Sequence, residues 1–356
     1  MTSERIQKLQ NFLTDNTAVI LFNKSNRLYF SNFISSAGAV VITKSKGFLF
    51  VDFRYFEKAK NTVKNLEVVL CERLYSQIGE VLKSQNIKTV FVETESLSLA
   101  KFEALKQNYP QIEISNQNIA EEFIKSLRSV KSQNEVNLIK QAQNITDKTF
   151  EYILDRIKVG RTEKEIALEM EFFMRKNGSE GIAFDTIAIS GKNTSLPHGV
   201  PTDKKIEKGD FFTMDFGAVS GGYCSDMTRT VAVGCVSERQ KFVYDTVLNA
   251  QTESLKIIKE GAVCKDIDAV ARNLIYNNGF EGCFGHGLGH SVGLEIHESP
   301  AFNTRDETVL KSGTVITVEP GIYLENEFGV RIEDMVLVTE NGIINLTESP
   351  KELIIL

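Results

Sequence analysis

The first 120 residues of the chain alternate between helix-like and strand-like patterns of hydrophobic and polar positions. An amphipathic stretch near residues 3–13 predicts a first helix. Short apolar runs then predict strands at residues 18–22, 38–42, 47–52, 68–70 and 89–92. Helical segments alternate with the later runs, so this part is predicted to be an α/β domain of moderate size. It contains no histidine and no motif that carries chemistry on its own.

A domain boundary is predicted near residues 124–131. Immediately after it, residues 132–135 (Ser-Gln-Asn-Glu) have the form of a capping box, in which the hydroxyl and the carboxylate satisfy free backbone amides at a helix start. A long helix is expected from there to about Ile157. A chain of 356 residues exceeds one typical domain, and we therefore predict two, at residues 1–125 and 126–356.

The second domain contains an internal repeat, because residues 157–182 and 258–283 match at a constant offset of 101. The shared positions are Ile157/Ile258, Lys158/Lys259, Gly160/Gly261, Lys164/Lys265, Ile166/Ile267, Asn177/Asn278, Gly178/Gly279, Glu180/Glu281 and Gly181/Gly282. Each unit is predicted to be a helix ending at a glycine, a short turn, and a second helix stopped by Asn-Gly. Two helix-turn-helix segments that merely share common residues are the alternative. The repeat favours two similar αβ halves around a pseudo-two-fold axis, with a cleft between them for a shared site.

Two acidic residues occur in strand-like segments of the first half. Asp215 lies inside the apolar run 211–217, and Asp226 follows eleven residues later, after a turn at residues 220–222. This is hairpin spacing, so the two carboxylates are expected to meet across adjacent strands.

The second half repeats the pattern. Glu319 ends the apolar run 313–319, and Glu333 follows in residues 329–334, with Arg331 two residues before it and therefore on the same strand face. A carboxylate inside an apolar strand is costly unless it is paired or bound to a cation. Separate salt bridges or turn acids are the alternative, but the pattern in both halves favours a cation site.

The four histidines of the chain all lie in its C-terminal half. They are His198, His286, His290 and His297. Three of them fall within twelve residues, in a segment rich in glycine. An HxxxH pattern can indicate a zinc-binding helix, but the glycines at 287, 289 and 293 oppose a stable helix. Close backbone approach to a site explains these glycines better.

Together these segments offer four carboxylates and one imidazole as metal ligands. They belong to Asp215, Asp226, His290, Glu319 and Glu333. Four negative charges neutralise two divalent cations and leave room for a bridging water. Oxygen-rich ligation favours Mn(II), Co(II) or Fe(II) in near-octahedral geometry over tetrahedral structural zinc. Two metals about 3.5 Å apart would polarise a carbonyl and lower the pKa of the water, which is a hydrolase arrangement.

Composition narrows the possible partners. The net charge is −6 and no block of Lys or Arg occurs, which argues against binding of nucleic acid or of acidic membranes. No apolar run approaches the roughly 18–20 residues of a membrane span, and the N-terminus lacks an apolar signal region. The five cysteines are scattered without a CxxC pair. We therefore expect reduced thiols in a cytoplasmic protein.

These segments resemble the metallopeptidases that share the pita-bread fold with methionine aminopeptidase, and most of all the branch of aminopeptidase P and prolidase. Residues 29–33 and 51–55 look like the first domain of that branch. The likeness continues through Pro197-His198-Gly199, the segments of Asp215 and Asp226, and residues 285–290, 319–321 and 331–334, in family order. It implies a creatinase-like N-terminal α/β domain followed by a pita-bread catalytic domain with a pseudo-two-fold repeat.

The resemblance also assigns roles to the ligands. It implies that Asp215 and Asp226 bind one metal and His290 the other, with Asp226 reaching both. Glu319 would bind the second metal and act as proton shuttle, and Glu333 would bridge the two ions. The expected cofactor is a pair of divalent ions, manganese first, with Co(II), Fe(II) or Zn(II) as alternatives.

The remaining site residues follow from the same resemblance. His198 and His297 correspond to residues that contact the substrate and stabilise the tetrahedral intermediate. His286, Tyr323 and Arg331 match positions that line the substrate site or support the ligands.

The function implied is hydrolysis of the Xaa-Pro bond at the N-terminus of a peptide with proline at position 2, by a homodimeric cytoplasmic Xaa-Pro aminopeptidase. An Xaa-Pro dipeptidase (prolidase) is the alternative, since Arg331 could serve a product carboxylate. Metal-free C–N hydrolysis of the creatinase type and a catalytically inactive binding protein are further alternatives. Complete ligation argues against both.

Overall fold

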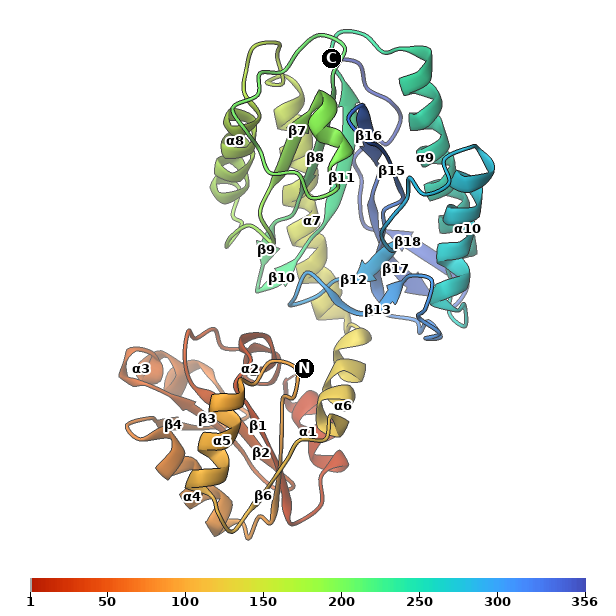
Figure 1. Cartoon of the computed structure of the whole chain (residues 1–356). Helices are drawn as coiled ribbons and strands as arrows, with labels where there is room; N and C mark the ends of the chain where they lie inside the picture. The colour runs from red at the N-terminus through yellow and green to blue at the C-terminus, as the bar shows by residue number, and fades with distance from the viewer. Residues whose placement is uncertain (1) are drawn as a thin grey trace. The chain divides into compact units, whose positions relative to one another are not determined.

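The structure is a computed structural model that describes residues 2–356, and the chain divides into two compact units. The first unit is Met1–Arg128 and the second is Ser129–Leu356. The mixed α/β fold class predicted from the sequence is confirmed (Figure 1). Each unit is described by itself below.

The first unit is built on a six-stranded sheet in the order β4-β3-β2-β1-β5-β6. Its strands are β1 (Thr17–Leu21), β2 (Ala39–Thr43), β3 (Gly47–Val51), β4 (Glu67–Leu70), β5 (Thr89–Val92) and β6 (Glu113–Ser115). Its helices are α1 (Thr2–Phe12), α2 (Lys24–Ser31), α3 (Phe53–Thr62), α4 (Leu74–Ser84), α5 (Leu99–Asn108) and α6 (Ile119–Ser129). β2 pairs antiparallel with both neighbours, whereas the β3–β4, β1–β5 and β5–β6 pairs are parallel. The near-continuous apolar runs in the sequence are explained by strands that are buried on both faces.

The first half of the second unit packs two helices on one small sheet (Figure 1). The helices are α7 (Gln133–Leu154) and α8 (Glu163–Lys176). The sheet has the order β11-β8-β7, with β7 (Ile187–Ser190), β8 (Phe211–Phe216) and β11 (Met227–Ala232). A short ladder of β9 (Val219–Ser220) with β10 (Tyr223–Cys224) lies between β8 and β11 in the chain, and the 3₁₀-helix η1 (Gly191–Ser195) follows β7.

The second half repeats this arrangement with a larger sheet. Its helices are α9 (Glu238–Ile257) and α10 (Cys264–Asn277). The sheet has the order β13-β12-β14-β17-β18, with β12 (Gly289–Ser291), β13 (Glu298–Phe302), β14 (Val315–Val318), β17 (Asp334–Thr339) and β18 (Gly342–Asn345). A separate hairpin pairs β15 (Gly321–Leu324) with β16 (Phe328–Arg331). Helices and sheet share one buried apolar core, as in the first half.

The repeat is visible in the helices, because α8 and α10 begin and end at positions shifted by 101 residues (163 + 101 = 264; 176 + 101 = 277). Gly178 and Gly279 follow these helices at φ of +98° and +89°, the left-handed conformation expected of the Asn-Gly stops. The first helix of each repeat was predicted to end at its glycine, and this prediction is wrong, since the helices end at Leu154 and Ile257. Gly160 and Gly261 lie in the turn before the second helix, at φ of +90° and +85°, where glycine carries no Cβ penalty.

The long helix after the boundary begins as predicted and ends early. The backbone N–H of Ser132 donates to Oε2 of Glu135 at 2.9 Å, as in the predicted capping box. α7 ends at Leu154 and not near Ile157, since the N–H of Arg156 bonds the carbonyl of Ile153, an i to i−3 contact that tightens the last turn.

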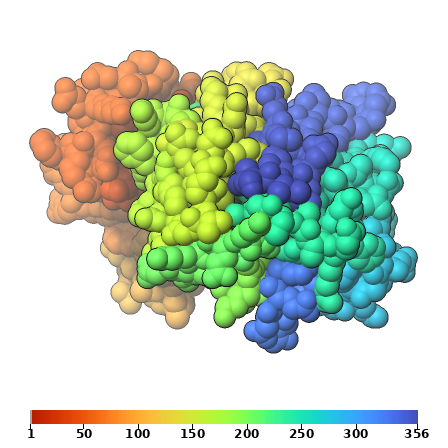
Figure 2. All heavy atoms as spheres, turned by 90° about the horizontal axis from the view of Figure 1, so that it is seen from above, coloured from red at the N-terminus to blue at the C-terminus, as the bar shows by residue number. Residues whose placement is uncertain are grey.

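The last residues of the chain connect the two halves of the second unit. The N–H of Leu356 donates to the carbonyl of Ala232 in β11, and the hydroxyl of Tyr244 in α9 donates to the carbonyl of Lys351. Leu353 packs on the core of the second half, while Ile354 packs on the core of the first. In Figure 2 this dark blue tail lies on the surface, beside both yellow-green and blue-green segments.

All five cysteines lie within the described residues and none forms a disulfide, as expected from their spacing. No helix among residues 2–356 has the length and apolar character that crossing a membrane requires.

Candidate metal centre

The first half presents its two aspartates from adjacent strands. β8 and β11 pair antiparallel, and the residue directly opposite Asp215 is Thr228, while Asp226 lies just before β11 begins. The hairpin was therefore predicted correctly, but Asp215 does not face Asp226 directly. The strands approach so closely beside Asp226 that a Cβ on Gly217 would stand 1.9 Å from the carbonyl oxygen of Ser225. Only glycine allows this approach.

The second half presents His290 from the short strand β12. The segment is not a helix, as its glycines predicted, and His290 lies in a three-residue strand. A Cβ on Gly289 would lie 2.0 Å from the carbonyl oxygen of Thr317 in β14, so glycine is required at this strand contact. The Thr317 hydroxyl then accepts the N–H of His290 at 3.0 Å and donates to Oε1 of Glu319 at 3.3 Å. One threonine therefore orients two candidate ligands.

Glu319 follows β14 directly, and Glu333 lies in the two-residue link between β16 and β17. The sequence had predicted that Arg331 and Glu333 share one strand. This is wrong, because Arg331 is the last residue of β16 and Glu333 lies in the link that follows. Both side chains nevertheless form hydrogen bonds with the hydroxyl of Thr228. The Thr228 hydroxyl accepts from Nε of Arg331 at 3.0 Å and donates to Oε2 of Glu333 at 2.7 Å.

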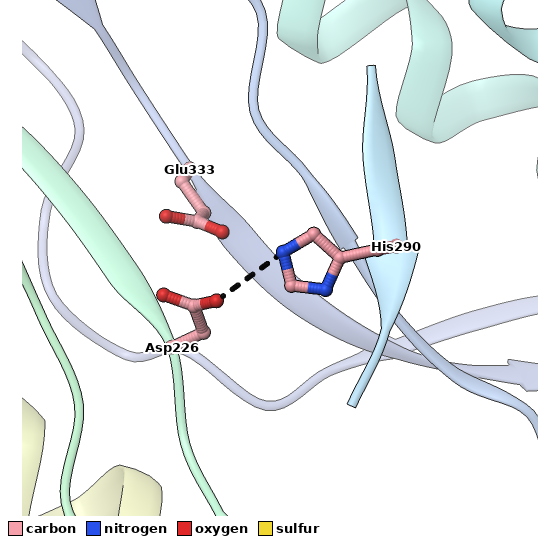
Figure 3. Close-up of side chains that lie close together, drawn as sticks. All are labelled: Asp226, His290 and Glu333. Atoms are coloured by element: carbon pink, nitrogen blue, oxygen red, sulfur yellow. Dashed lines mark ion pairs between the residues drawn. The ribbon is translucent and has the colours of Figure 1, made fainter. Parts of the chain in front are cut away.

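Three candidate ligands converge on one point. One ligand atom each from Asp226, His290 and Glu333 lies within 4.8 Å of the others (Figure 3). Nε2 of His290 stands 3.5 Å from Oδ2 of Asp226 and 3.4 Å from Oε1 of Glu319. Asp215 lines the same cavity and its Oδ2 contacts Arg331 at 2.6 Å. The structure thus gathers all five predicted ligands, three of them closely.

The protonation states fit a cation at this point. Burial, with the nearby charge of His297, lowers the pKa of His290 to about 4, so the ring is neutral. Its Nδ1 lies 3.2 Å from the carbonyl oxygen of Ser291, which assigns the proton to Nδ1 and leaves the lone pair on Nε2. That lone pair faces oxygens of two carboxyl groups. Without a proton or a cation between them, these acceptors would repel one another.

The carboxyl groups give the same indication. Burial, then the mutual repulsion of the acids, raises the pKa of Asp226 and of Glu333 well above the ordinary values. Burial also raises the pKa of Glu319, to about 8. Among the described residues, Oδ1 of Asp215 and Oε1 of Glu333 are buried and have no hydrogen-bond partner. Buried acceptors without donors fit a site for divalent cations, which supply the missing positive charge.

Arg331 supports the ligands and is not free to bind substrate. Its Nη2 donates to Asp215, its Nε to Thr228, and its Nη1 to the hydroxyl of Tyr323 at 2.8 Å and to the carbonyl of Pro197 at 3.2 Å. The side chain is buried. Of the two roles that the sequence left open for Arg331, the contacts favour support of the ligands.

Tyr323 and His286 extend this support. Tyr323 accepts from Arg331, so its hydroxyl proton points to Nε2 of His286 at 2.8 Å, and Nδ1 of His286 donates to the carbonyl of Gly287 at 2.8 Å. Burial, then the charge of Arg331, lowers the pKa of His286 to about 4, which agrees with a neutral ring. His286 lines the cavity, whereas Tyr323 lies behind it.

The cluster of candidate ligands opens into a cavity of about 800 Å³ within the second unit. His198 and His297 line it together with Asp226 and Glu319. The ring of His297 stacks edge-on against His290, with 4.4 Å between ring centres, and burial lowers its pKa. Both histidines therefore line the same cavity as the candidate ligands.

Several supporting residues were not predicted from the sequence. Thr228 was missed because the register of β8 and β11, which sets it opposite Asp215, is not visible in the sequence. Asp268, which is buried, and Arg272, which is partly buried, lie four residues apart on α10 and form an ion pair that also bonds the loop leading to His290. Arg272 donates to the carbonyls of Phe284 and His286, and Asp268 accepts the N–H of Leu288. The spacing of the pair was visible, but its contact with the loop was not.

This fold and cluster define a metal-dependent peptidase. Residues 137–340 match the model of metallopeptidase family M24, and residues 5–130 match the creatinase/prolidase N-terminal domain. The chain belongs to metallopeptidase family M24. The recognition of the pita-bread metallopeptidases from the sequence is thereby confirmed.

Individual relatives cover the whole chain. An Xaa-Pro dipeptidase from Pyrococcus furiosus is 40% identical over 354 residues, which is 99% of each chain. The structure of an Xaa-Pro dipeptidase from Bacillus anthracis superposes with a TM-score of 0.95 at 40% identity and covers 100% of both chains. The structure of an X-Pro aminopeptidase from Thermotoga maritima gives a TM-score of 0.90 at 37% identity, over 98% of this chain and 100% of the other.

Proposed function

We propose that the protein hydrolyses the peptide bond between an N-terminal residue and proline, and that it acts as an Xaa-Pro dipeptidase. The observation that carries the proposal is the buried cluster of acceptors in a cavity, on a chain that is 40% identical over its whole length to a protein named Xaa-Pro dipeptidase. The sequence alone had favoured the aminopeptidase. The relatives favour the dipeptidase.

We assign two divalent ions to the site, held by Asp215, Asp226, His290, Glu319 and Glu333, with manganese as the first candidate. Four carboxylates and one neutral imidazole are a donor set for oxygen-preferring divalent ions, and four negative charges balance two of them. When bound, such a pair polarises the scissile carbonyl and supplies an activated water as nucleophile.

The chain's own residues would perform the remaining steps. Glu319 lines the cavity beside the cluster, so its carboxylate can take up a proton and pass it to the leaving imino nitrogen of proline. His198 and His297 line the cavity beside the cluster and can donate N–H groups to the developing oxyanion. Thr228, Tyr323 and Arg331 hold the ligands and contribute no proton transfer of their own.

An Xaa-Pro aminopeptidase is the second candidate, and one observation favours it. A dipeptidase needs a cation for the product carboxylate. Among the described residues that line the cavity, Arg331 is the only Arg or Lys, and its guanidinium is engaged on every nitrogen. The likeness to the X-Pro aminopeptidase of Thermotoga maritima agrees with this candidate.

Product analysis separates the two candidates. The manganese-loaded protein is incubated with Gly-Pro and, separately, with a longer Xaa-Pro-Xaa peptide, beside a chelated sample and an Asp226→Asn variant. Cleavage of Gly-Pro alone supports the dipeptidase, whereas cleavage of the longer peptide supports the aminopeptidase. No cleavage of either by metal-replete protein contradicts the proposed function. The homodimer and the cytoplasmic location stay predictions from the sequence.

A further inference from the structure

Glu163, the first residue of α8, has a fully buried carboxylate outside the metal cluster. Its Oε1 accepts from the N–H of Ser190 at 2.7 Å, the Ser190 hydroxyl at 3.0 Å and Nδ2 of Asn193 at 3.0 Å. Its Oε2 accepts from the N–H of Thr202 at 2.9 Å and the Thr202 hydroxyl at 2.6 Å. Nδ2 of Asn193 also reaches Oε2 at 3.2 Å, so this one side chain receives six hydrogen bonds from three residues.

These partners stand at the two ends of one segment. Ser190 and Asn193 lie at the start of residues 190–202 and Thr202 lies at the end, with His198 between them. The middle of the segment contributes little to the core, since Leu196 is 55% exposed and Val200 is 75% exposed. The place of His198 therefore depends on how both ends are held.

Contacts in the interior of the segment support its backbone. Nη1 of Arg331 bonds the carbonyl of Pro197 at 3.2 Å, and the hydroxyl of Thr194 accepts the N–H of Gly329 at 2.8 Å. Neither contact reaches the residues that follow His198. At that end, Glu163 binds Thr202 through its side chain, and the N–H of Glu163 donates to the carbonyl of Lys204.

The buried carboxylate of Glu163 is stabilised by hydrogen bonds from neutral donors, and no basic side chain among residues 2–356 bonds it directly. The nearby Lys204 ammonium bonds Ser190 and Asp210. Glu163 itself stands at the positive end of α8, which favours an anion there. A buried carboxylate is costly unless its oxygens are fully bonded, so this arrangement tolerates replacement of its acceptors poorly.

The second half of the unit has no equivalent of this carboxylate. The position 101 residues later is Cys264, the first residue of α10. There the loop leading to His290 is held instead by Asp268 and Arg272. The carboxylate at the start of the helix is thus specific to the half whose following segment carries His198.

We propose that Glu163 is a positioning residue for the reaction. It clamps both ends of residues 190–202 and thereby holds the His198 imidazole at the cavity wall beside His286 and His297. The proposal rests on the proposed function only in so far as His198 acts on the substrate.

The kinetic test uses Glu163→Gln, which keeps the shape but places an NH₂ group against donors. Glu165→Gln is the matched control, because Glu165 is exposed in the same helix turn and caps Thr162. The kcat/KM for the peptide that the wild type cleaves is expected to fall roughly 10- to 100-fold in Glu163→Gln, as for a small misplacement of a catalytic group. It should stay within about twofold in Glu165→Gln, because the control leaves residues 190–202 untouched.

A double-variant cycle separates positioning from general damage. In the His198→Ala background, Glu163→Gln should cause no further loss of kcat/KM, because its effect acts through the removed imidazole. An equal loss in both backgrounds, or an unchanged kcat/KM in Glu163→Gln, overturns the proposal. If Glu163→Gln does not fold, Asn193→Ala removes the bonds of Asn193 to both oxygens of Glu163 and is put through the same cycle.

An activity-independent measurement separates this proposal from the proposed function. Amide hydrogen exchange across residues 190–202 should be faster in Glu163→Gln than in the wild type and unchanged in Glu165→Gln, with equal manganese content in all three. Faster exchange in Glu163→Gln would uphold the clamp even if the wild type cleaves no Xaa-Pro peptide and the proposed function fails. Unchanged exchange in Glu163→Gln refutes the clamp whatever the activity.

Discussion

The metal-free protein should be stabilised by removing one of its own candidate ligands. Glu333 is 1% exposed, its Oε2 accepts from Thr228, and its buried Oε1 has no partner among the described residues. In Glu333→Gln, the amide oxygen can keep the bond to Thr228, and the NH₂ group replaces the unpaired oxygen near Asp226. A repulsion between two carboxyl groups would then become a possible hydrogen bond.

The magnitude follows from the distance. Ligand atoms of Glu333 and Asp226 lie within 4.8 Å. Two unit charges at that separation repel by about 3.5 kcal/mol at an effective dielectric constant of 20. The raised pKa values of both acids mean that partial protonation relieves some of this repulsion. We therefore expect a stabilisation of roughly 1–3 kcal/mol, or about 2–10 °C in Tm for a unit of this size.

Calorimetry with chelator and with manganese provides the assay. With chelator, Glu333→Gln should unfold at a higher temperature than the wild type. With manganese the order should reverse, because the variant loses a ligand and binding stabilises it less. Glu325→Gln is the control, since Glu325 is exposed and lies outside the cluster of candidate ligands. A variant that is less stable than the wild type under both conditions would refute a cluster held together by cations.

Three further outcomes follow from the geometry. Burial lowers the pKa of His286 from 6.5 to about 4, so unfolding takes up a proton between these values. The wild type should then lose about 3 kcal/mol as the pH falls from 6.5 to 4, and urea titrations should show this loss missing in metal-free His286→Gln. Gly289→Ala should weaken manganese binding about tenfold or more, because its Cβ would meet Thr317 in β14, whereas Gly285→Ala has open space and should bind normally in calorimetric titration. Arg229→Met should cost roughly 3–5 kcal/mol in urea unfolding, since it removes one of the two basic partners of the buried Asp334 and takes a donor from several carbonyls, and a cost below about 1 kcal/mol would contradict that role.

The sequence alone was sufficient for the architecture of both units. Apolar runs of strand length in the first 92 residues correspond to strands β1 to β5, because strands buried on both faces need such runs. The offset of 101 residues is reproduced by α8 and α10 to the residue. Helix ends were less accurate, since α7 stops where a backbone turn, and not a sequence signal, ends it.

The candidate ligands could also be predicted from the sequence. Burying an acid in an apolar strand costs free energy unless a partner or a cation compensates, and the histidines cluster among glycines. The partners of these ligands could not be predicted. Strand register places Thr228 opposite Asp215. Arg331 donates hydrogen bonds to four acceptors, and these come from distant segments of the chain.

The sequence by itself therefore determined the chemical types of the site and the order of the elements that carry them. Local spacing and hydrophobic period contain that information directly. Only the tertiary structure decided which atoms lie within bonding distance, which oxygens remain unpaired, and that Glu163 holds both ends of the segment around His198. These contacts join residues that are 27 to 39 positions apart in the clamp and over 100 apart at Thr228, and no local pattern encodes such pairings.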